Sequence, residues 1–133
     1  MVDVTRTDWI EVVHRPFEDG PPLPALQRSG RPWPGWTRRW WRVISRMPHC
    51  VLWSTAEWRF ALDTAMVAAA FHSGDLKQAK ELRQREAVLG TTLDARRQLR
   101  IRYVDAPPVQ RPTGATAIED YRRRLMTPNA GGR

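Results

Sequence analysis

The chain has 133 residues, enough for one domain, and its 41% hydrophobic content is that of a globular protein rather than a disordered one. Its 22 Lys and Arg residues against 14 Asp and Glu residues give a net charge of +8, which favours a polyanionic partner: nucleic acid first, then an anionic membrane or an acidic protein. The lone Cys50 excludes an internal disulfide framework, and no apolar run approaches the roughly 20 residues that span a bilayer. We therefore expect a soluble protein of a reducing compartment with no membrane partner.

The placement of proline divides the chain into three regions. Residues 1–35 hold a density of prolines that no helix tolerates, so we predict an extended, Pro-rich N-terminal arm with one short strand or anchor at 9–13. Residues 36–104 are predicted to form a helical core and oligomerisation domain, and residues 105–133 a linker and a short C-terminal helix. The predicted fold class is all-α: a small, oligomeric helical core, made of a helical hairpin plus flanking helices, with extended arms.

Local signals place the first two helices of the core. Apolar positions at helical spacing predict a helix over Thr37–Met47, with Thr37 as its N-cap. Ser54 followed three residues later by Glu57 is a capping box, and it predicts a second helix that continues to about His72.

Three shorter helices are predicted after the second one. The third is expected to run from Asp75 to Gly90, with a narrow apolar stripe and many charged side chains. The fourth is expected to begin at a Thr92 cap and continue through Arg102. A last short helix, about Ala117–Met126, follows the linker.

Tryptophans gather before and within the first two helices. They fit either a core built of large rings or a surface that stacks single-stranded nucleic acid. We favour the core, because one helical face carries Trp36, Trp40, Ile44 and Met47. The cluster consists of Trp33, Trp36, Trp40, Trp41, Trp53 and Trp58.

The interior of the second helix is apolar on nearly every face. A helix of this kind must be covered all round, and the neighbouring helices offer too little apolar surface to cover it. We therefore predict a homo-oligomer in which another subunit covers the remainder. The predicted oligomerisation residues are Trp58, Phe60, Leu62, Met66, Val67 and Phe71.

Arginines supply the candidate DNA contacts, because the guanidinium group is suited to bidentate phosphate binding. One set lies on the first helix, and its alternative role is a solvated surface. The other lies in a helix–Gly–helix segment that is either a DNA-reading helix-turn-helix or a structural corner. The predicted DNA-binding residues are Arg38, Arg39, Arg42, Arg46, Arg96, Arg97 and Arg100.

Enzyme motifs are missing from the sequence. It contains neither a G-x-x-x-x-G-K-[ST] phosphate loop nor a G-x-S-x-G nucleophile elbow. The one carboxylate embedded in an apolar helix, Asp63, is interpreted as an interface residue rather than a catalytic one. The histidines show no metal-ligand spacing, so we predict no catalytic residue, no metal and no cofactor.

The last predicted helix carries its apolar side chains, Ile118, Tyr121 and Leu125, on one face. An isolated helix this short is marginal in water. It therefore either docks into a groove of a partner or folds back on its own core.

The segment ELRQREAVLGTTLDARRQLRIRY resembles the LR.RE..LGLTP.ARR.LR signature of small terminase subunits from phages of actinobacteria. The Trp-rich stretch before the capped helix and the closing IEDYRRRL extend this resemblance over about residues 32–126. The sequence departs from the signature at Leu93, where the family usually has proline. Residues 1–35 also contain too many prolines for the N-terminal helix-turn-helix of many small terminases.

The resemblance implies a non-catalytic component of a DNA-packaging machine in the host cytoplasm. Such a subunit forms a ring, recognises viral double-stranded DNA and delivers it to the large terminase subunit, which carries the ATPase and nuclease. Ile118, Tyr121 and Leu125 are then the predicted large-subunit contacts. The alternatives are a virion structural or connector protein that binds only protein, and a small helix-turn-helix regulator.

Overall fold

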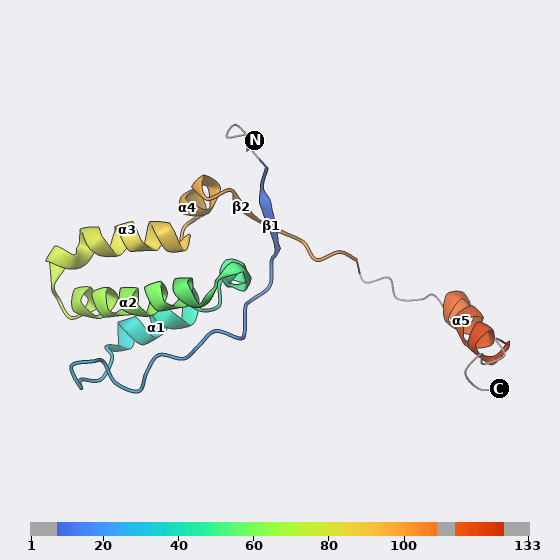
Figure 1. Cartoon of the computed structure of the whole chain (residues 1–133), viewed down its shortest axis with the longest axis horizontal. Helices are drawn as coiled ribbons and strands as arrows, with labels where there is room; N and C mark the ends of the chain where they lie inside the picture. Colours follow the sequence, from blue (N-terminus) through green and yellow to red (C-terminus); the bar gives the residue numbers. More distant parts are fainter. Residues whose placement is uncertain (1–7, 109–113, 127–133) are drawn as a thin grey trace.

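The computed structural model describes residues 8–108 and 114–126, so the parts of the predicted arm, linker and tail at 1–7, 109–113 and 127–133 lie outside it. Figure 1 shows the arrangement of its elements. In chain order they are β1 (Ile10–Val13), α1 (Gly35–Ile44), the 3-10 helix η1 (Pro48–Leu52), α2 (Thr55–His72), the 3-10 helix η2 (Leu76–Gln78), α3 (Ala79–Leu89), α4 (Leu93–Gln98), β2 (Ile101–Val104) and α5 (Gly114–Met126). None of the described helices is both long and apolar enough to cross a membrane.

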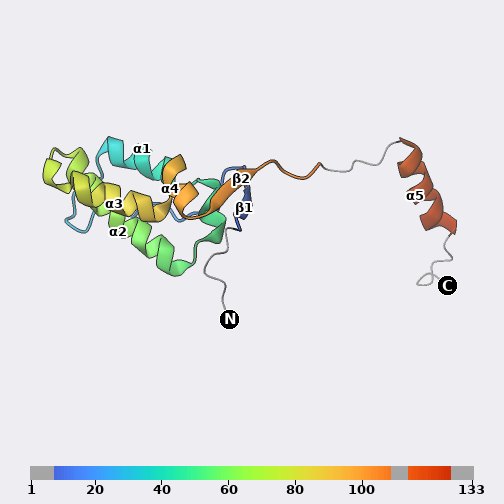
Figure 2. The ribbon, with the colours of Figure 1, turned by 90° about the horizontal axis from the view of Figure 1, so that it is seen from above.

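Helices α2 and α3 form the predicted hairpin, and α1 packs against α2 (Figures 1 and 2). The Ser54–Glu57 capping box starts α2 as predicted, and Gly90, with a φ of 73°, ends α3 in the left-handed conformation. The buried face of α2 is built mainly of alanines, which allow its neighbours to approach closely. These are Ala61, Ala65, Ala68 and Ala69.

The predicted N-cap of α1 is wrong, because the helix begins two residues earlier. Pro34 occupies the N-cap position, and Pro is well suited to this end of a helix since its missing N–H would have no helical partner there. Thr37 lies inside the first turn and is fully buried. Its Oγ1 is 2.8 Å from Nδ1 of His72, which joins the start of α1 to the end of α2.

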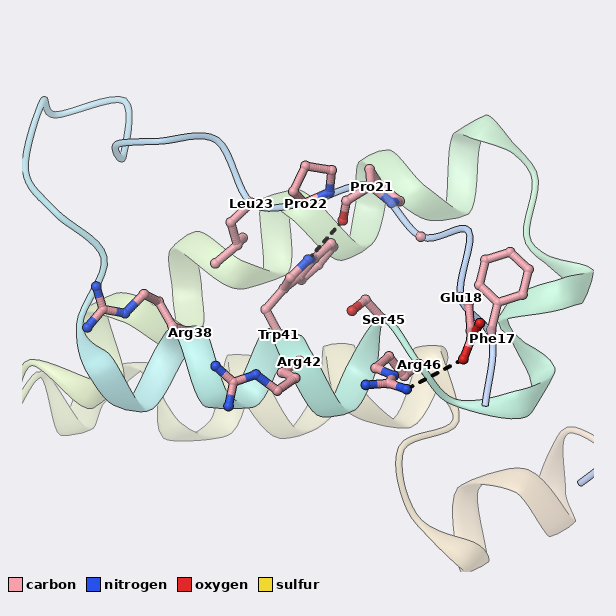
Figure 3. Close-up of a pocket in the computed structure, with 11 residues that line it drawn as sticks. Phe17, Glu18, Pro21, Pro22, Leu23, Arg38, Trp41, Arg42, Ser45 and Arg46 are labelled. Atoms are coloured by element: carbon pink, nitrogen blue, oxygen red, sulfur yellow. Dashed lines mark hydrogen bonds and ion pairs between the residues drawn. The ribbon is translucent and has the colours of Figure 1, made fainter. Parts of the chain in front are cut away.

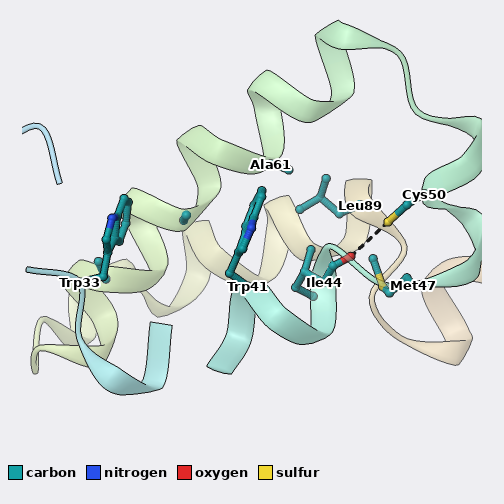
Figure 4. Close-up of a cluster of buried hydrophobic side chains, with 9 residues drawn as sticks. Trp33, Trp41, Ile44, Met47, Cys50, Ala61 and Leu89 are labelled. Carbon is teal, nitrogen blue, oxygen red and sulfur yellow. Dashed lines mark hydrogen bonds between the residues drawn. The ribbon is translucent and has the colours of Figure 1, made fainter. Parts of the chain in front are cut away.

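The core contains large rings, as predicted, but Trp36 is not among them. Trp41 is 5% exposed and Trp33 is also buried, whereas Trp36 is 65% exposed. Figure 4 shows Trp33 and Trp41 beside α2, with Ile44 and Leu89 in the same cluster. Of the four residues predicted on one face, Ile44 and Met47 are buried and Trp40 packs against the core, so the prediction is wrong for Trp36 alone.

The segment that leads from β1 to α1 lies against the helices instead of projecting from them (Figure 1). Its carbonyl groups accept hydrogen bonds from two core rings: Trp41 Nε1 donates to Pro21 at 3.0 Å and Trp33 Nε1 donates to Pro24 at 2.8 Å. A Cβ atom at Gly20 would lie 2.9 Å from the carbonyl oxygen of Ser45. The missing side chain at Gly20 therefore lets this segment approach the end of α1.

The predicted fourth helix is wrong at its C-terminal end, so the fold is mainly helical but not all-α. Helix α4 ends at Gln98, and β2 then pairs in parallel with β1, with Ile10 opposite Ile101. The backbone N–H of Ile10 donates to the carbonyl of Arg100 at 2.7 Å. Arg100 has a φ of 60°, which breaks the helix, and the β-branched residues after it favour a strand.

Candidate nucleic-acid interface

Helix α1 and the turn after it place three of the predicted arginines in one row. Arg38, Arg42 and Arg46 are four residues apart, so they lie one above the other on the same face, and all three are exposed. Figure 3 shows them along the near side of α1. We call these three residues the arginine row.

A groove of about 510 Å³ runs beside the arginine row, between α1 and residues 17–23 of the N-terminal segment. Its floor is apolar and includes Leu23 and Trp41 (Figure 3). Glu18 is the one carboxylate on its wall, 3.8 Å from the guanidinium of Arg46. The groove therefore has a strongly cationic rim.

Arg39 lies on a different face of α1 from the arginine row. Its guanidinium stands over the ring of Trp36, 4.8 Å from the ring centre. Both residues line a second groove of about 450 Å³ that also includes Val43 and Glu86. The arginines predicted on α1 thus divide between two surfaces.

Residues 5–126 match the family model described as phage terminase small subunit. The chain belongs to the phage terminase small subunit family. No curated protein and no solved structure matches the chain. The resemblance seen in the sequence is therefore confirmed at the level of the family, while the assignment to actinobacterial phages stays a prediction. Family membership gives this small terminase subunit a role in phage DNA packaging, and small terminase subunits are generally non-catalytic.

In this small terminase subunit the other predicted DNA-binding arginines do not form a second row on α4; they are Arg96, Arg97 and Arg100. Arg96 is half-buried, with Nη1 donating to the carbonyl of Gly90 at 3.1 Å and its guanidinium 4.8 Å from the ring centre of Tyr103. These contacts hold Arg96 within the fold. Arg97 is exposed on α4, whereas Arg100 lies beyond the helix.

Arg100 belongs to a cluster that the sequence did not indicate. Its guanidinium lies 5.6 Å from the ring centre of Trp9, and that of Arg102 lies 5.4 Å from the same ring. Arg102 also pairs with Glu11 across the sheet at 3.0 Å. These contacts depend on the pairing of β1 with β2. The sequence analysis predicted a helix through Arg102 and therefore did not bring these residues together.

The predicted oligomerisation residues are partly covered by their own chain. Trp58 lies against the rings of Phe17 and Trp53, and the guanidinium of Arg85 stands over Phe60. Leu62, Val67 and Phe71 are half-buried and Met66 is 37% exposed. Phe17 of the N-terminal segment, Trp53 before α2 and Arg85 of α3 thus supply cover that the sequence analysis assigned to another subunit.

Part of α2 nevertheless remains open. Leu62 and Met66 line a hollow of about 230 Å³, with Leu26 of the N-terminal segment on its wall. Asp63, predicted to be an interface residue, is exposed at the same hollow. The oligomerisation surface therefore stays a prediction, with a smaller apolar area to bury.

Helix α5 contacts none of the other described helices or strands, and Figure 1 shows it apart from the core. Its predicted contact residues Ile118, Tyr121 and Leu125 are all exposed.

In the described part of the chain, no group of three His, Cys, Asp or Glu side chains is arranged to hold a metal ion.

Proposed function

We propose that this small terminase subunit recognises viral double-stranded DNA through the arginine row and delivers it to the large terminase subunit for packaging. The observation that supports DNA binding is the exposed alignment of Arg38, Arg42 and Arg46 on one face, with Glu18 as the one nearby carboxylate. Arg38 and Arg42 are separated by a rise of about 6 Å along α1, and Arg46 follows in the turn after the helix. Guanidinium groups placed in this way can each engage a phosphate of the DNA backbone.

The proposal is tested by removing two charges of the row with Arg38→Gln and Arg42→Gln. If each arginine engages one phosphate, the slope of log affinity against log salt concentration should fall by about 1.8, because each released contact contributes about 0.9. Fluorescence anisotropy with a labelled duplex, repeated from low to physiological salt, measures this slope.

A matched control carries the same change of charge on α3, with Lys80→Gln and Arg83→Gln at two exposed positions. This control should keep the wild-type slope. An equal loss in both double variants would show that net charge alone governs binding. Wild-type affinity that barely changes with salt would contradict phosphate binding altogether.

The proposal further includes a homo-oligomer, in ring form, that presents α5 to the large subunit. The apolar hollow at Met66 supports self-association, and the exposed side chains of α5 support a partner contact. The double variant Ile118→Ser and Leu125→Ser should lose capture of the purified large subunit. Its mass by light scattering should stay equal to that of the wild-type oligomer, at several times the 15.4 kDa of one chain.

The two readouts of this experiment separate the two parts of the proposal. A mass of one chain at micromolar concentration would contradict the oligomer. Capture of the large subunit at wild-type strength would contradict docking through α5. The ring is the form expected of a heterologous contact that closes on itself.

A further inference from the structure

The groove beside the arginine row has an apolar floor that phosphates bound to the arginines would not contact. This floor is formed by Leu23 and Phe17 from the N-terminal segment and by Trp41 from α1, with Ser45 among them (Figure 3). A duplex backbone presents charged phosphates and sugars, which gain little from apolar surface. A volume of about 510 Å³ is instead in the range of sites that enclose side chains or small ligands.

The charges around this floor define the other half of the ligand. Arg38 and Arg42 form no ion pair with any described residue, and Arg46 has Glu18 at the long distance of 3.8 Å. Guanidinium groups pair most strongly with carboxylates and phosphates in a bidentate geometry. A ligand that satisfies both rim and floor must therefore combine anionic groups with at least one apolar side chain.

We propose that this groove binds an acidic, apolar segment of a protein partner, with carboxylates on Arg38 and Arg42 and an apolar side chain on the floor between Leu23 and Trp41. Charge argues against a second copy of this chain as the occupant. The chain carries a net charge of +8, and α5, its exposed apolar helix, carries Arg122, Arg123 and Arg124 against Glu119 and Asp120, a net +1. Like charges at the rim would oppose that docking.

One consequence rests on the proposed DNA-binding function. Because Arg38 and Arg42 would serve both ligands, the acidic segment and DNA should exclude each other. Binding of the partner would then release DNA from the arginine row.

The test uses the full chain and four labelled peptides, three of 12 residues and one of 13. The first alternates Asp and Glu with Leu and Phe, and the second replaces its Leu and Phe by Ala at the same charge. The third replaces its acids by Lys, and the fourth is residues 114–126 of this chain. By fluorescence anisotropy, the first should bind at least about tenfold more tightly than each of the others, because only the first offers both carboxylates for the rim and large apolar side chains for the floor.

Several outcomes would overturn the proposal. Equal binding of the first and second peptides would show plain charge attraction without use of the floor. Tighter binding of residues 114–126 would make this chain's own helix the occupant. Unlabelled acidic peptide that fails to displace a labelled duplex, at concentrations that saturate the groove, would exclude competition.

A protein variant separates this proposal from the DNA-binding one. Leu23→Asp removes the apolar floor and places a like charge against the peptide, so it should weaken binding of the first peptide at least tenfold. It leaves the arginine row intact, so duplex affinity should fall far less than in the Arg38→Gln, Arg42→Gln variant. Peptide binding that depends on Leu23 in a protein with no affinity for duplex would refute the proposed function and keep the groove assignment, whereas the reverse result would refute the groove assignment alone.

Discussion

Replacing Trp41 by alanine should lower the free energy of unfolding by about 3–5 kcal/mol, the range expected when a buried large ring is truncated to a methyl group. The ring is 5% exposed and packs edge-on against Trp58, with 6.2 Å between ring centres. Its Nε1 also donates to the carbonyl of Pro21 at 3.0 Å, which anchors the N-terminal segment on α1. Urea or guanidinium unfolding followed by circular dichroism measures the change.

Trp36→Ala is the matched control, because it makes the same chemical change in the same helix. Trp36 is 65% exposed, and the guanidinium of Arg39 lies 4.8 Å from its ring centre. The expected loss is about 1 kcal/mol or less. Similar losses at both positions would contradict the orientation of α1 seen here.

Signals between neighbours in sequence predicted both ends of α2, the end of α3 and the start of α4. The predicted third helix, by contrast, opens as the separate 3-10 helix η2 before α3 begins at Ala79, and α4 ends at Gln98. The Ser54–Glu57 box and the Thr92 cap each involve groups three residues apart, and both hydrogen bonds form as expected. Gly90 ends α3 for a local reason too, since it adopts a φ that other residues avoid. Interactions of this range can be predicted from the sequence because no distant part of the chain takes part in them.

The errors arise where a distant segment decides the local structure. Strand β2 forms because β1, from the other end of the core, supplies its hydrogen-bond partners. The apolar stripe on α1 was correctly detected, but rings on both sides of the helix gave similar patterns. Trp41 is buried because it faces α2, and its Nε1 donates to the carbonyl of Pro21, which lies 20 residues away in the chain.

For the candidate site, the sequence predicted the arginines on α1 but not the groove beside them. Residue type and helical spacing are enough to align Arg38, Arg42 and Arg46. The groove beside them needs Leu23 and Phe17, which the sequence analysis left in an extended arm. Because the same segment also covers part of α2, its position weakens the argument for an oligomer and creates the argument for a protein ligand.

His49 joins three parts of the core through one imidazole. The side chain is 1% exposed, with Nε2 2.7 Å from the carbonyl oxygen of Leu89 and Nδ1 2.6 Å from the hydroxyl of Tyr103. A carbonyl oxygen only accepts hydrogen bonds, so Nε2 carries a proton; in the neutral ring Nδ1 then accepts from the Tyr103 hydroxyl. Burial favours this neutral form by lowering the pKa of His49, and the ring connects η1, the end of α3 and β2.

The free energy of unfolding should consequently rise with pH from the lowered folded-state pKa of His49 up through its ordinary value of 6.5. Burial lowers the pKa of His49 below its ordinary value of 6.5, the charge of Arg96 lowers it further, and the hydrogen bond to Leu89 opposes both. In this range the unfolded chain binds more protons than the folded one. The contribution of His49 to the free energy of unfolding is therefore fully present above pH 6.5 and is lost as the pH falls toward the folded-state pKa. Chemical unfolding at a series of pH values measures the slope.

His49→Gln should flatten this profile, because its amide can still donate to the Leu89 carbonyl but does not titrate. It should also cost about 1–3 kcal/mol at pH 7, since the Tyr103 hydroxyl loses a well-placed acceptor in a buried site. Burial also lowers the pKa of His72, but that ring is only half-buried, so His72→Gln should remove a smaller part of the slope. A wild-type profile that is flat, or a slope that survives in His49→Gln and disappears in His72→Gln, would contradict a neutral His49 at the centre of the fold.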